Sequence, residues 1–142
     1  MSEPLLAARD IHTYYGDSYV IQGVSLDVLV GQIVTLLGRN GIGKTTVIRS
    51  VAGLTPPRHG KITVKGHSLV GYPPYKIAKL GLALVPQGRQ IFPSLTVREN
   101  LLLPTSKLAV GRVPGSNMAA RWNLAAVQEQ FRRLAERAGQ LG

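Results

Sequence analysis

Nine consecutive residues decide the fold of this 142-residue chain: Gly38-Arg39-Asn40-Gly41-Ile42-Gly43-Lys44-Thr45-Thr46. They fit the pattern G-x-x-x-x-G-K-[ST] of a phosphate-binding loop. The apolar, β-rich run 32–37 before them predicts a buried strand, and the run 45–52 after them predicts a helix. A strand, a glycine-rich loop and a helix in this order indicate an α/β fold.

The residue types of this loop suit an anionic ligand. Its glycines permit positive φ and let the backbone approach phosphates without an intervening Cβ. The backbone N–H groups and the start of the helix then offer positive charge. Lys44 is expected to reach the β- and γ-phosphates of a nucleotide, and the Thr45 hydroxyl to bind Mg²⁺. The plain alternative is a glycine-rich turn without a ligand, but the complete pattern favours nucleotide binding by residues 38–46.

The composition predicts a single soluble globular domain. The apolar share is 44% and the mean hydropathy is +0.09. No apolar run approaches the roughly 18 residues of a membrane span. Residues 1–4 lack the basic start and apolar region of a signal peptide, and the absence of cysteine excludes disulfides and thiolate metal sites. A cytoplasmic location is therefore expected.

The net charge of +10 is unusual and allows two interpretations. One is a polyanionic partner such as nucleic acid or anionic lipid. The other is an ordinary solvated surface whose acidic counterpart is missing from the chain. The basic residues are scattered, and the densest stretch, 132–137, includes acidic residues. Because a nucleic-acid patch normally clusters, we expect the second interpretation and no nucleic-acid partner.

Hydrophobic periodicity and turn signals predict the remaining elements. Two strands, 5–13 and 19–30, precede the loop strand and suggest an antiparallel β addition to the α/β core. A strand is expected at 61–64, a helix at 74–80 and a second buried strand at 82–85. The capping box Thr96-Val97-Arg98-Glu99 starts a short helix. A loop is expected over 103–118 and one amphipathic helix over 119–141, with its apolar stripe packed in a core.

These features together resemble the ATP-binding subunit of ABC transporters. The resemblance rests on residues 15–26 upstream of the loop, on the turn 53–60 with its following strand, and on the stretch 84–101. The sequence 38–46 together with Val85-Pro86-Gln87-Gly88-Arg89 is most similar to subunits that serve branched-chain amino acid or urea importers. The implied fold is a P-loop NTPase core in residues 1–95, followed by the beginning of a helical subdomain in 96–142.

The resemblance implies roles for two residues outside the loop. Tyr15 matches the aromatic residue that stacks on adenine in this family, a contact that needs only a flat π-face. Tyr14 and Tyr19 are alternatives, as is a tyrosine without a role in a turn. Gln87 matches the glutamine of the family's Q-loop, where it would bind Mg²⁺ or position water. The implied ligands are ATP and Mg²⁺.

The resemblance also implies partners and shows what the chain lacks. Expected partners are transmembrane permease subunits and a second ATP-binding subunit, which would hold the protein at the inner face of the cell membrane. The sequence contains no match to the family's Leu-Ser-Gly-Gly signature or to its Asp-Glu strand. It also has no match to the family's switch histidine, because all three histidines precede Gln87. The chain is thus expected to represent the N-terminal part of such a subunit and not to hydrolyse ATP efficiently alone.

Three other functions remain open from the sequence. The first alternative is a stand-alone nucleotide-binding module without turnover. The second is a small-molecule phosphotransferase, which the two strands with Tyr15 ahead of the loop disfavour. The third is a nucleic-acid binder, suggested by charge alone; its binding would fall steeply with salt and would not depend on ATP.

Overall fold

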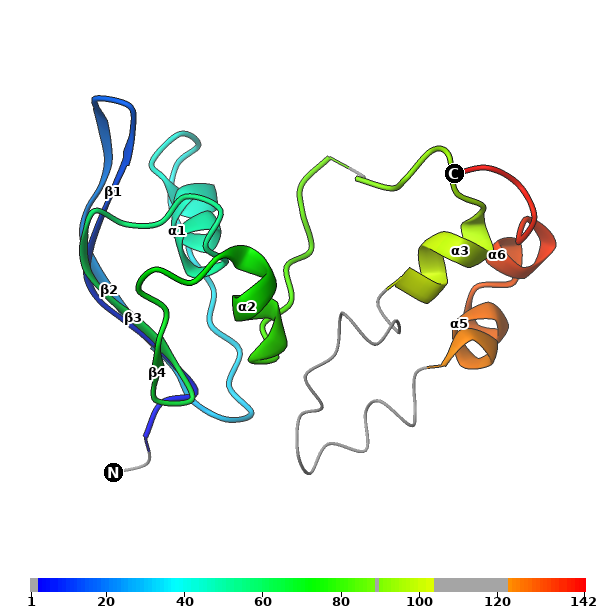
Figure 1. Ribbon diagram of the computed structural model, residues 1–142, viewed down its shortest axis with the longest axis horizontal. Coiled ribbons are helices and arrows are strands. Elements are labelled where there is room, and N and C mark those ends of the chain that lie inside the picture. The colour runs from blue at the N-terminus through cyan, green and yellow to red at the C-terminus, as the bar shows by residue number, and fades with distance from the viewer. Residues whose placement is uncertain (1–2, 89, 104–122) are drawn as a thin grey trace. The chain divides into compact units, whose positions relative to one another are not determined.

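A computed structural model describes residues 3–88, 90–103 and 123–142 of the chain (Figure 1). It divides into two compact units, residues 1–82 and residues 83–142. The first unit contains a sheet, two helices and the glycine-rich loop. The second contains short helices and the segment around Gln87.

The first unit is built on a four-stranded antiparallel sheet. Its strands are β1 (Leu6–Tyr15), β2 (Ser18–Val28), β3 (His59–Val64) and β4 (His67–Ser68). They lie in the order β2-β1-β3-β4, and every neighbouring pair is antiparallel. A two-residue turn joins β1 to β2, where Tyr15 pairs with Ser18. The predicted antiparallel addition is therefore confirmed, and its strands lie within two residues of the predicted bounds.

Two helices cover one side of this sheet (Figure 1). They are α1 (Lys44–Val51) and α2 (Pro74–Lys79), both close to their predicted positions. Proline occupies the first turn of α2, where its missing N–H leaves no hydrogen bond unmade. The core between sheet and helices contains the following buried side chains: Ala8, Ile11, Ile21, Val47, Val51, Ile62, Val64, Leu69 and Ile77.

A pair of buried hydroxyl groups also joins the sheet to α1. Thr13 on β1 and Ser50 on α1 are both buried, and their oxygen atoms lie 2.9 Å apart. The Ser50 hydroxyl donates to the Thr46 carbonyl oxygen at 2.8 Å. Thr13 can then donate its proton to Ser50, so both buried hydroxyls are satisfied. This pair fixes α1, and with it the glycine-rich loop, against β1.

Two predicted strands are wrong. Segments 32–37 and 82–85 are irregular, and neither pairs with a strand in the described part of the chain. Ile33 is 92% exposed and Val85 is 93% exposed, whereas Leu36 and Leu82 still pack on the core. An apolar run forms a strand only where another strand supplies hydrogen bonds to its backbone. The sheet of this unit provides no such neighbour for either segment.

The second unit consists of short helices. They are α3 (Val97–Leu102), α5 (Leu124–Gln130) and α6 (Arg132–Glu136). The predicted capping box at α3 is confirmed: the Thr96 side chain accepts a hydrogen bond from the Glu99 N–H, and the Glu99 carboxylate accepts one from the Thr96 N–H. Nearly all of the predicted loop 103–118 lies outside the described residues.

The prediction of one helix over 119–141 is wrong for the residues that the structure describes. The chain leaves helical geometry at Phe131, which ends α5 and begins α6, and residues 119–122 lie outside the description. The stripe is only partly covered: Phe131 is 54% exposed, whereas Leu124 and Leu134 are half-buried. Amphipathic helices gain most of their stability from packing of the apolar face. Without that packing, periodicity alone did not produce a continuous helix.

Backbone hydrogen bonds join the end of the chain to α3. The N–H groups of Val97 and Arg98 donate to the carbonyl oxygens of Gln140 and Ala138 at 2.8 and 3.0 Å. The Gly142 N–H donates to the Leu95 carbonyl oxygen at 2.9 Å. Figure 1 shows the C-terminal segment beside the start of α3. These bonds hold residues 138–141 outside the helix that the sequence predicted for them.

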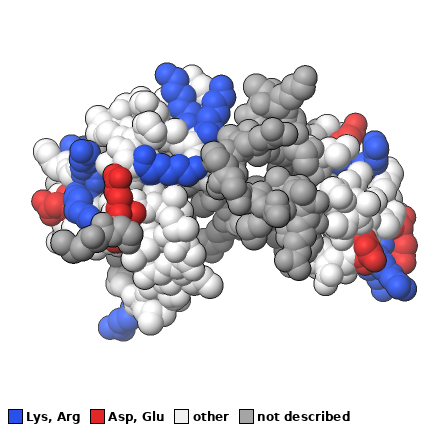
Figure 2. Space-filling view, turned by 90° about the horizontal axis from the view of Figure 1, so that it is seen from below, with Lys and Arg blue, Asp and Glu red and all other residues white. Residues whose placement is uncertain are grey.

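The surface of the described residues shows dispersed positive charge. Figure 2 shows Lys and Arg side chains at several separate places on the face it presents. One guanidinium, that of Arg9, lies 2.6 Å from the Asp27 carboxylate in an exposed ion pair. No helix in the described ranges is long and apolar enough to cross a membrane.

Candidate phosphate-binding site

The position immediately before α1 is one that only glycine occupies without strain. Gly43 immediately precedes α1 and has φ +98°, a left-handed conformation that L side chains rarely adopt. A Cβ at this position would lie 2.6 Å from the Ile21 Cδ1 atom of β2. Gly43 therefore lets the start of α1 approach the sheet closely. Its carbonyl oxygen also accepts a hydrogen bond from Val47 at 2.9 Å.

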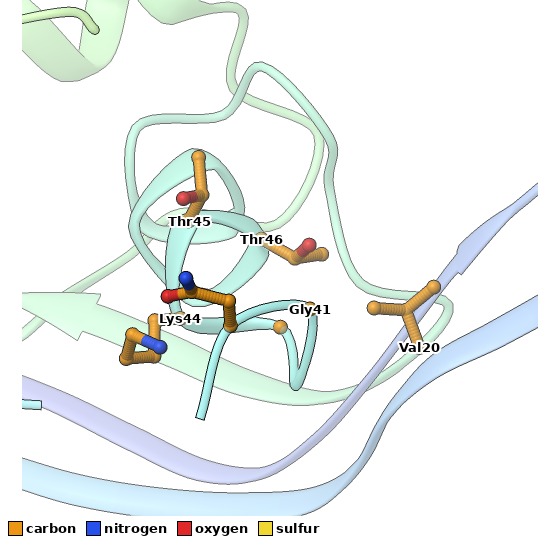
Figure 3. A pocket seen from close by; sticks show the side chains of 7 residues that line it. Val20, Gly41, Lys44, Thr45 and Thr46 are labelled. Atoms are coloured by element: carbon orange, nitrogen blue, oxygen red, sulfur yellow. The ribbon is translucent and has the colours of Figure 1, made fainter. Parts of the chain in front are cut away.

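An open hollow of about 220 Å³ lies at the start of α1 (Figure 3). Its lining comprises Val20, Asn40, Gly41, Gly43, Lys44, Thr45 and Thr46. Six of these seven belong to the predicted loop, so the structure brings most of the predicted residues around one cavity. Three predicted loop residues do not line the hollow. The carbonyl oxygens of Gly38 and Arg39 accept hydrogen bonds from Lys44, and the Ile42 side chain lies next to Gly38.

Lys44 is the positive charge of this site. Its Nζ atom donates hydrogen bonds to the carbonyl oxygens of Gly38 and Arg39, at 2.8 and 2.6 Å. The side chain thus folds back across the loop and holds its ammonium group beside the hollow. Carbonyl oxygens are neutral acceptors, and hydrogen bonds from an ammonium group to a charged oxygen are about twice as strong. An anion entering the hollow can therefore replace them.

The start of α1 adds to this positive potential. The first turn of α1 contains no acidic residue, so its partial positive charge is not neutralised by its own side chains. Thr45 is exposed at this end of the helix, and Thr46 is buried. An ammonium group, unpaired helix N–H groups and a hydroxyl around one hollow form a combination suited to a phosphate chain and its metal ion.

Val20 is a lining residue that sequence reasoning missed. It lies on β2 next to the buried Ile21, and its side chain faces the loop (Figure 3). The sequence places Val20 in a strand, but only the packing of α1 against the β1–β2 hairpin brings that strand to the phosphate loop. No local pattern around Val20 signals this contact.

Tyr15 lies at the end of β1, and its ring is 44% exposed. A side-chain hydrogen bond from Thr55 is the main influence that lowers the pKa of Tyr15; Thr46 and Arg49 act in the same direction, against desolvation. Thr46 also lines the hollow. These influences on Tyr15 come from residues of α1 and of the segment that follows it.

The two alternative tyrosines use their ring faces for each other. The rings of Tyr14 and Tyr19 stack with centroids 4.5 Å apart and an angle of 4° between planes. The Arg58 guanidinium lies 4.5 Å from the Tyr14 centroid, and Tyr19 also stacks with His12 at 5.8 Å. Tyr15 is absent from the ring stacks of the described residues. Of the three, it is the tyrosine best able to accept a base.

Gln87 is exposed and belongs to the second unit. The phosphate loop belongs to the first unit. The metal-binding role predicted for Gln87 therefore stays a prediction. Arg89, which follows it closely, lies outside the described residues.

Comparisons with known proteins agree on one family. The family model described as ABC transporter matches residues 21–141, which include the whole phosphate loop. BraG of Pseudomonas aeruginosa, a high-affinity branched-chain amino acid transport ATP-binding protein, is 40% identical over 99 residues, or 70% of this chain and 42% of BraG. LsrA of an Enterobacter species, an autoinducer 2 import ATP-binding protein, is 36% identical over 81% of this chain and 23% of LsrA. The chain thus spans less than half the length of these relatives.

The fold agrees with a solved structure from the same family. That structure, of an ATP-binding subunit of an ABC transporter, matches with a TM-score of 0.75 and 28% sequence identity. The match covers 96% of this chain and 54% of the solved chain. The chain therefore belongs to the ABC transporter family and is related to its ATP-binding subunits.

Proposed function

We propose that this chain binds Mg-ATP through residues 38–46, as part of the energy-coupling subunit of a transporter. The observation that carries the proposal is the position of the Lys44 ammonium group, 2.8 and 2.6 Å from two loop carbonyl oxygens at the edge of a hollow. The hollow also contains the start of α1 and the Thr45 hydroxyl. A triphosphate matches each of these groups.

The residues divide between the parts of the nucleotide. Lys44 and the backbone of 38–43 hold the β- and γ-phosphates, and Thr45 and Thr46 contact the phosphate chain at the start of α1. The Thr45 hydroxyl holds Mg²⁺, with Gln87 as a further ligand. Tyr15 stacks on adenine. When bound, Mg²⁺ neutralises phosphate charge, a task that Lys44 shares.

Turnover needs groups that this sequence does not contain. Hydrolysis requires a group that orients or deprotonates water and a carboxylate that helps to hold Mg²⁺. The sequence has no apolar run followed by Asp-Glu and no Ser-Gly-Gly. We expect nucleotide binding without efficient hydrolysis by these 142 residues. A non-hydrolysing nucleotide-binding module remains the second candidate, and phosphate release measured with and without the missing segments distinguishes the two.

The relatives support the transport role that we propose. The BraG similarity supports an importer of branched-chain amino acids, or of urea as the sequence resemblance suggested, whereas LsrA shows that a similar chain serves autoinducer 2 import. The partners are permease subunits and a second ATP-binding subunit, which place the protein at the cytoplasmic face of the membrane. Copurification with permease subunits that are coexpressed with this protein tests this part of the proposal.

Replacement of Lys44 tests the phosphate site. Lys44→Ala removes the only side chain of the hollow that carries positive charge, and binding of a fluorescent ATP analogue should be abolished. Lys61→Ala, a change of the same kind on β3, serves as the control and should leave binding unchanged. Equal affinities of Lys44→Ala and the unaltered chain would refute the assignment.

Replacement of Tyr15 tests the adenine site. Tyr15→Ala should weaken ATP by about 1–3 kcal/mol, the usual contribution of one base–aromatic stack, and should leave inorganic tripolyphosphate unaffected. Tyr75→Ala removes an exposed tyrosine from α2 and is the control. Isothermal titration calorimetry with both ligands measures the difference. Equal weakening of both ligands would contradict stacking.

A further inference from the structure

Arg58 contacts β1 and the turn that follows it at three places. It lies in the segment between α1 and β3. Its backbone N–H donates a hydrogen bond to the His12 carbonyl oxygen at 2.8 Å. Its guanidinium lies over the Tyr14 ring, 4.5 Å from the ring centroid, and its Nη2 atom donates to the Gly16 carbonyl oxygen at 2.7 Å. One arginine therefore holds the end of β1 at residues 12, 14 and 16.

The Tyr14 ring belongs to a row of stacked rings on one face of the β1–β2 hairpin. It stacks on the ring of Tyr19, its cross-strand partner, with 4.5 Å between centroids. Tyr19 also stacks with His12 at 5.8 Å. The Arg58 guanidinium lies at the Tyr14 end of this row. Rotation of the Tyr14 side chain would break its contacts with both neighbours, so the row holds this part of β1 in one conformation.

Tyr15 lies between two of the Arg58 contacts along the chain. Tyr14 precedes it and Gly16 follows it, and the same guanidinium contacts both. Successive side chains of a strand point to opposite faces, so Tyr15 shares the face of Thr13 and not that of Tyr14. On that face the Thr13 hydroxyl contacts the Ser50 hydroxyl of α1 at 2.9 Å. The contacts of Arg58 thus fix the backbone at Tyr15 from the other face and leave its ring on the side of α1, the helix that begins at the phosphate hollow.

We infer that Arg58 is a positioning residue that fixes the backbone on both sides of Tyr15 and so holds the Tyr15 ring ready to stack on the adenine base. This inference rests on the proposed function, because it needs Tyr15 to contact adenine. A segment that is fixed before binding loses less conformational freedom when the base stacks on its ring. The effect should therefore appear with ligands that contain a base and be absent with ligands that contain only phosphates.

Calorimetry on the 142-residue chain measures the affinities of ATP and inorganic tripolyphosphate, each with Mg²⁺. Arg58→Ala removes both contacts of the guanidinium and keeps the backbone N–H that donates to His12. The variant should bind ATP about 2- to 10-fold more weakly, which corresponds to the cost of ordering one side chain on binding. Its affinity for tripolyphosphate should be unchanged. A loss of simple charge attraction would instead weaken both ligands.

A double-mutant cycle tests whether Arg58 acts through Tyr15. Tyr15→Ala alone should weaken ATP, because it removes the stacking ring. Addition of Arg58→Ala to Tyr15→Ala should cause no further loss, since no ring remains to be positioned. A residue that only stabilises the fold would weaken ATP equally with and without the Tyr15 ring.

Two further variants serve as control and as second test. Arg9→Ala removes the same charge from the first half of β1, where the guanidinium contacts Asp27 and the Leu26 carbonyl oxygen, and both affinities should stay unchanged. Tyr14→Leu removes the ring beneath the Arg58 guanidinium and keeps an apolar side chain. It should weaken ATP and not tripolyphosphate, and it decides the test if Arg58→Ala does not fold.

The outcomes distinguish this inference from the proposal on which it rests. An unaltered chain that binds neither ligand would overturn the proposed function, and the positioning role with it. If Tyr15→Ala weakens ATP but Arg58→Ala, or Tyr14→Leu in its place, does not, only the positioning role is overturned. Equal losses for ATP and tripolyphosphate would also overturn it, as would a further loss when Arg58→Ala is added to Tyr15→Ala, because Arg58 would then act on the fold or on the charge and not on the ring.

Discussion

The two units of the described chain are stabilised in different ways. Every buried side chain in the described residues lies within residues 1–82, whereas α3, α5 and α6 of the second unit bury none. The second unit is instead held by directional bonds: the Thr96 capping box, the bonds between residues 138–142 and 95–98, and the Asn100 amide, which donates to Phe92 and Leu95. The phosphate loop therefore belongs to a unit with a packed core, and Gln87 to a unit without one.

This difference bears on the candidate site. Apolar packing involves many atoms at once and opens only when the whole unit unfolds, whereas a few exposed hydrogen bonds open locally. The residues that we propose to bind the phosphates and the base, Lys44, Thr45 and Tyr15, therefore lie in the unit with the packed core. Gln87 is not supported by comparable packing among the described residues. We expect the two units to differ measurably in local stability, and three changes probe that difference.

A cavity created by mutation should lower the stability of the first unit much more than that of the second. Ile11→Ala removes a side chain that is fully buried, and the free energy of unfolding of the first unit should fall by about 2–5 kcal/mol. Leu134→Ala removes a half-buried side chain from α6 and should lower stability by about 1 kcal/mol or less. Native-state hydrogen exchange followed by mass spectrometry reports both units. Similar losses in the two would disprove the contrast.

The buried hydroxyl pair allows a smaller test within the first unit. Ser50→Ala leaves the buried Thr13 hydroxyl without its partner, and stability should fall by about 1–3 kcal/mol. Ser94→Ala changes an exposed serine of the second unit and should have an effect within about 0.5 kcal/mol. Urea denaturation of both variants measures the two values. A neutral Ser50→Ala would show that Thr13 finds another partner.

Acidification should weaken the Thr96–Glu99 capping box of α3 in the second unit. This is the smallest of the three expected effects. The backbone N–H of Thr96, and then its hydroxyl, lower the pKa of Glu99 below its ordinary value. The unfolded chain thus binds this proton at a higher pH than the folded chain does. The cap's contribution is complete above the ordinary glutamate pKa of about 4.3 and is lost as the pH falls through the lower folded value.

Amide exchange of α3 measured from pH 6 downward, after correction for intrinsic rates, checks this expectation. Protection of α3 should fall with acidification in the unaltered chain. Glu99→Gln keeps the capping geometry but cannot titrate, so its α3 should show no such fall. An equal fall in both proteins would assign the effect to another group.

The same contrast explains which of the predictions made from the sequence the structure confirms. Elements that carry their own signals were located correctly: the capping box at Thr96, the proline in the first turn of α2, and the loop with α1 after it. Each signal acts within one turn of the chain, so it does not depend on distant partners. Strands 32–37 and 82–85 and the continuous helix 119–141 were predicted from apolar pattern alone, which becomes structure only when another element covers it.

The predictions about the candidate site divide in a similar way into local features and contacts between distant residues. The sequence located residues 38–46 because a phosphate loop places its chemistry within nine consecutive positions. It could not find Val20, because strand packing depends on contacts between distant residues.

The sequence by itself determined the phosphate loop, the antiparallel hairpin before it, the family and the cap of α3, because each is written in local spacing and residue type. Only the tertiary structure decided which apolar runs are buried and which tyrosine ring takes part in no stack. The physical reason is that burial and hydrogen bonding between distant segments depend on what the folded chain places beside them, and no local pattern encodes that neighbour.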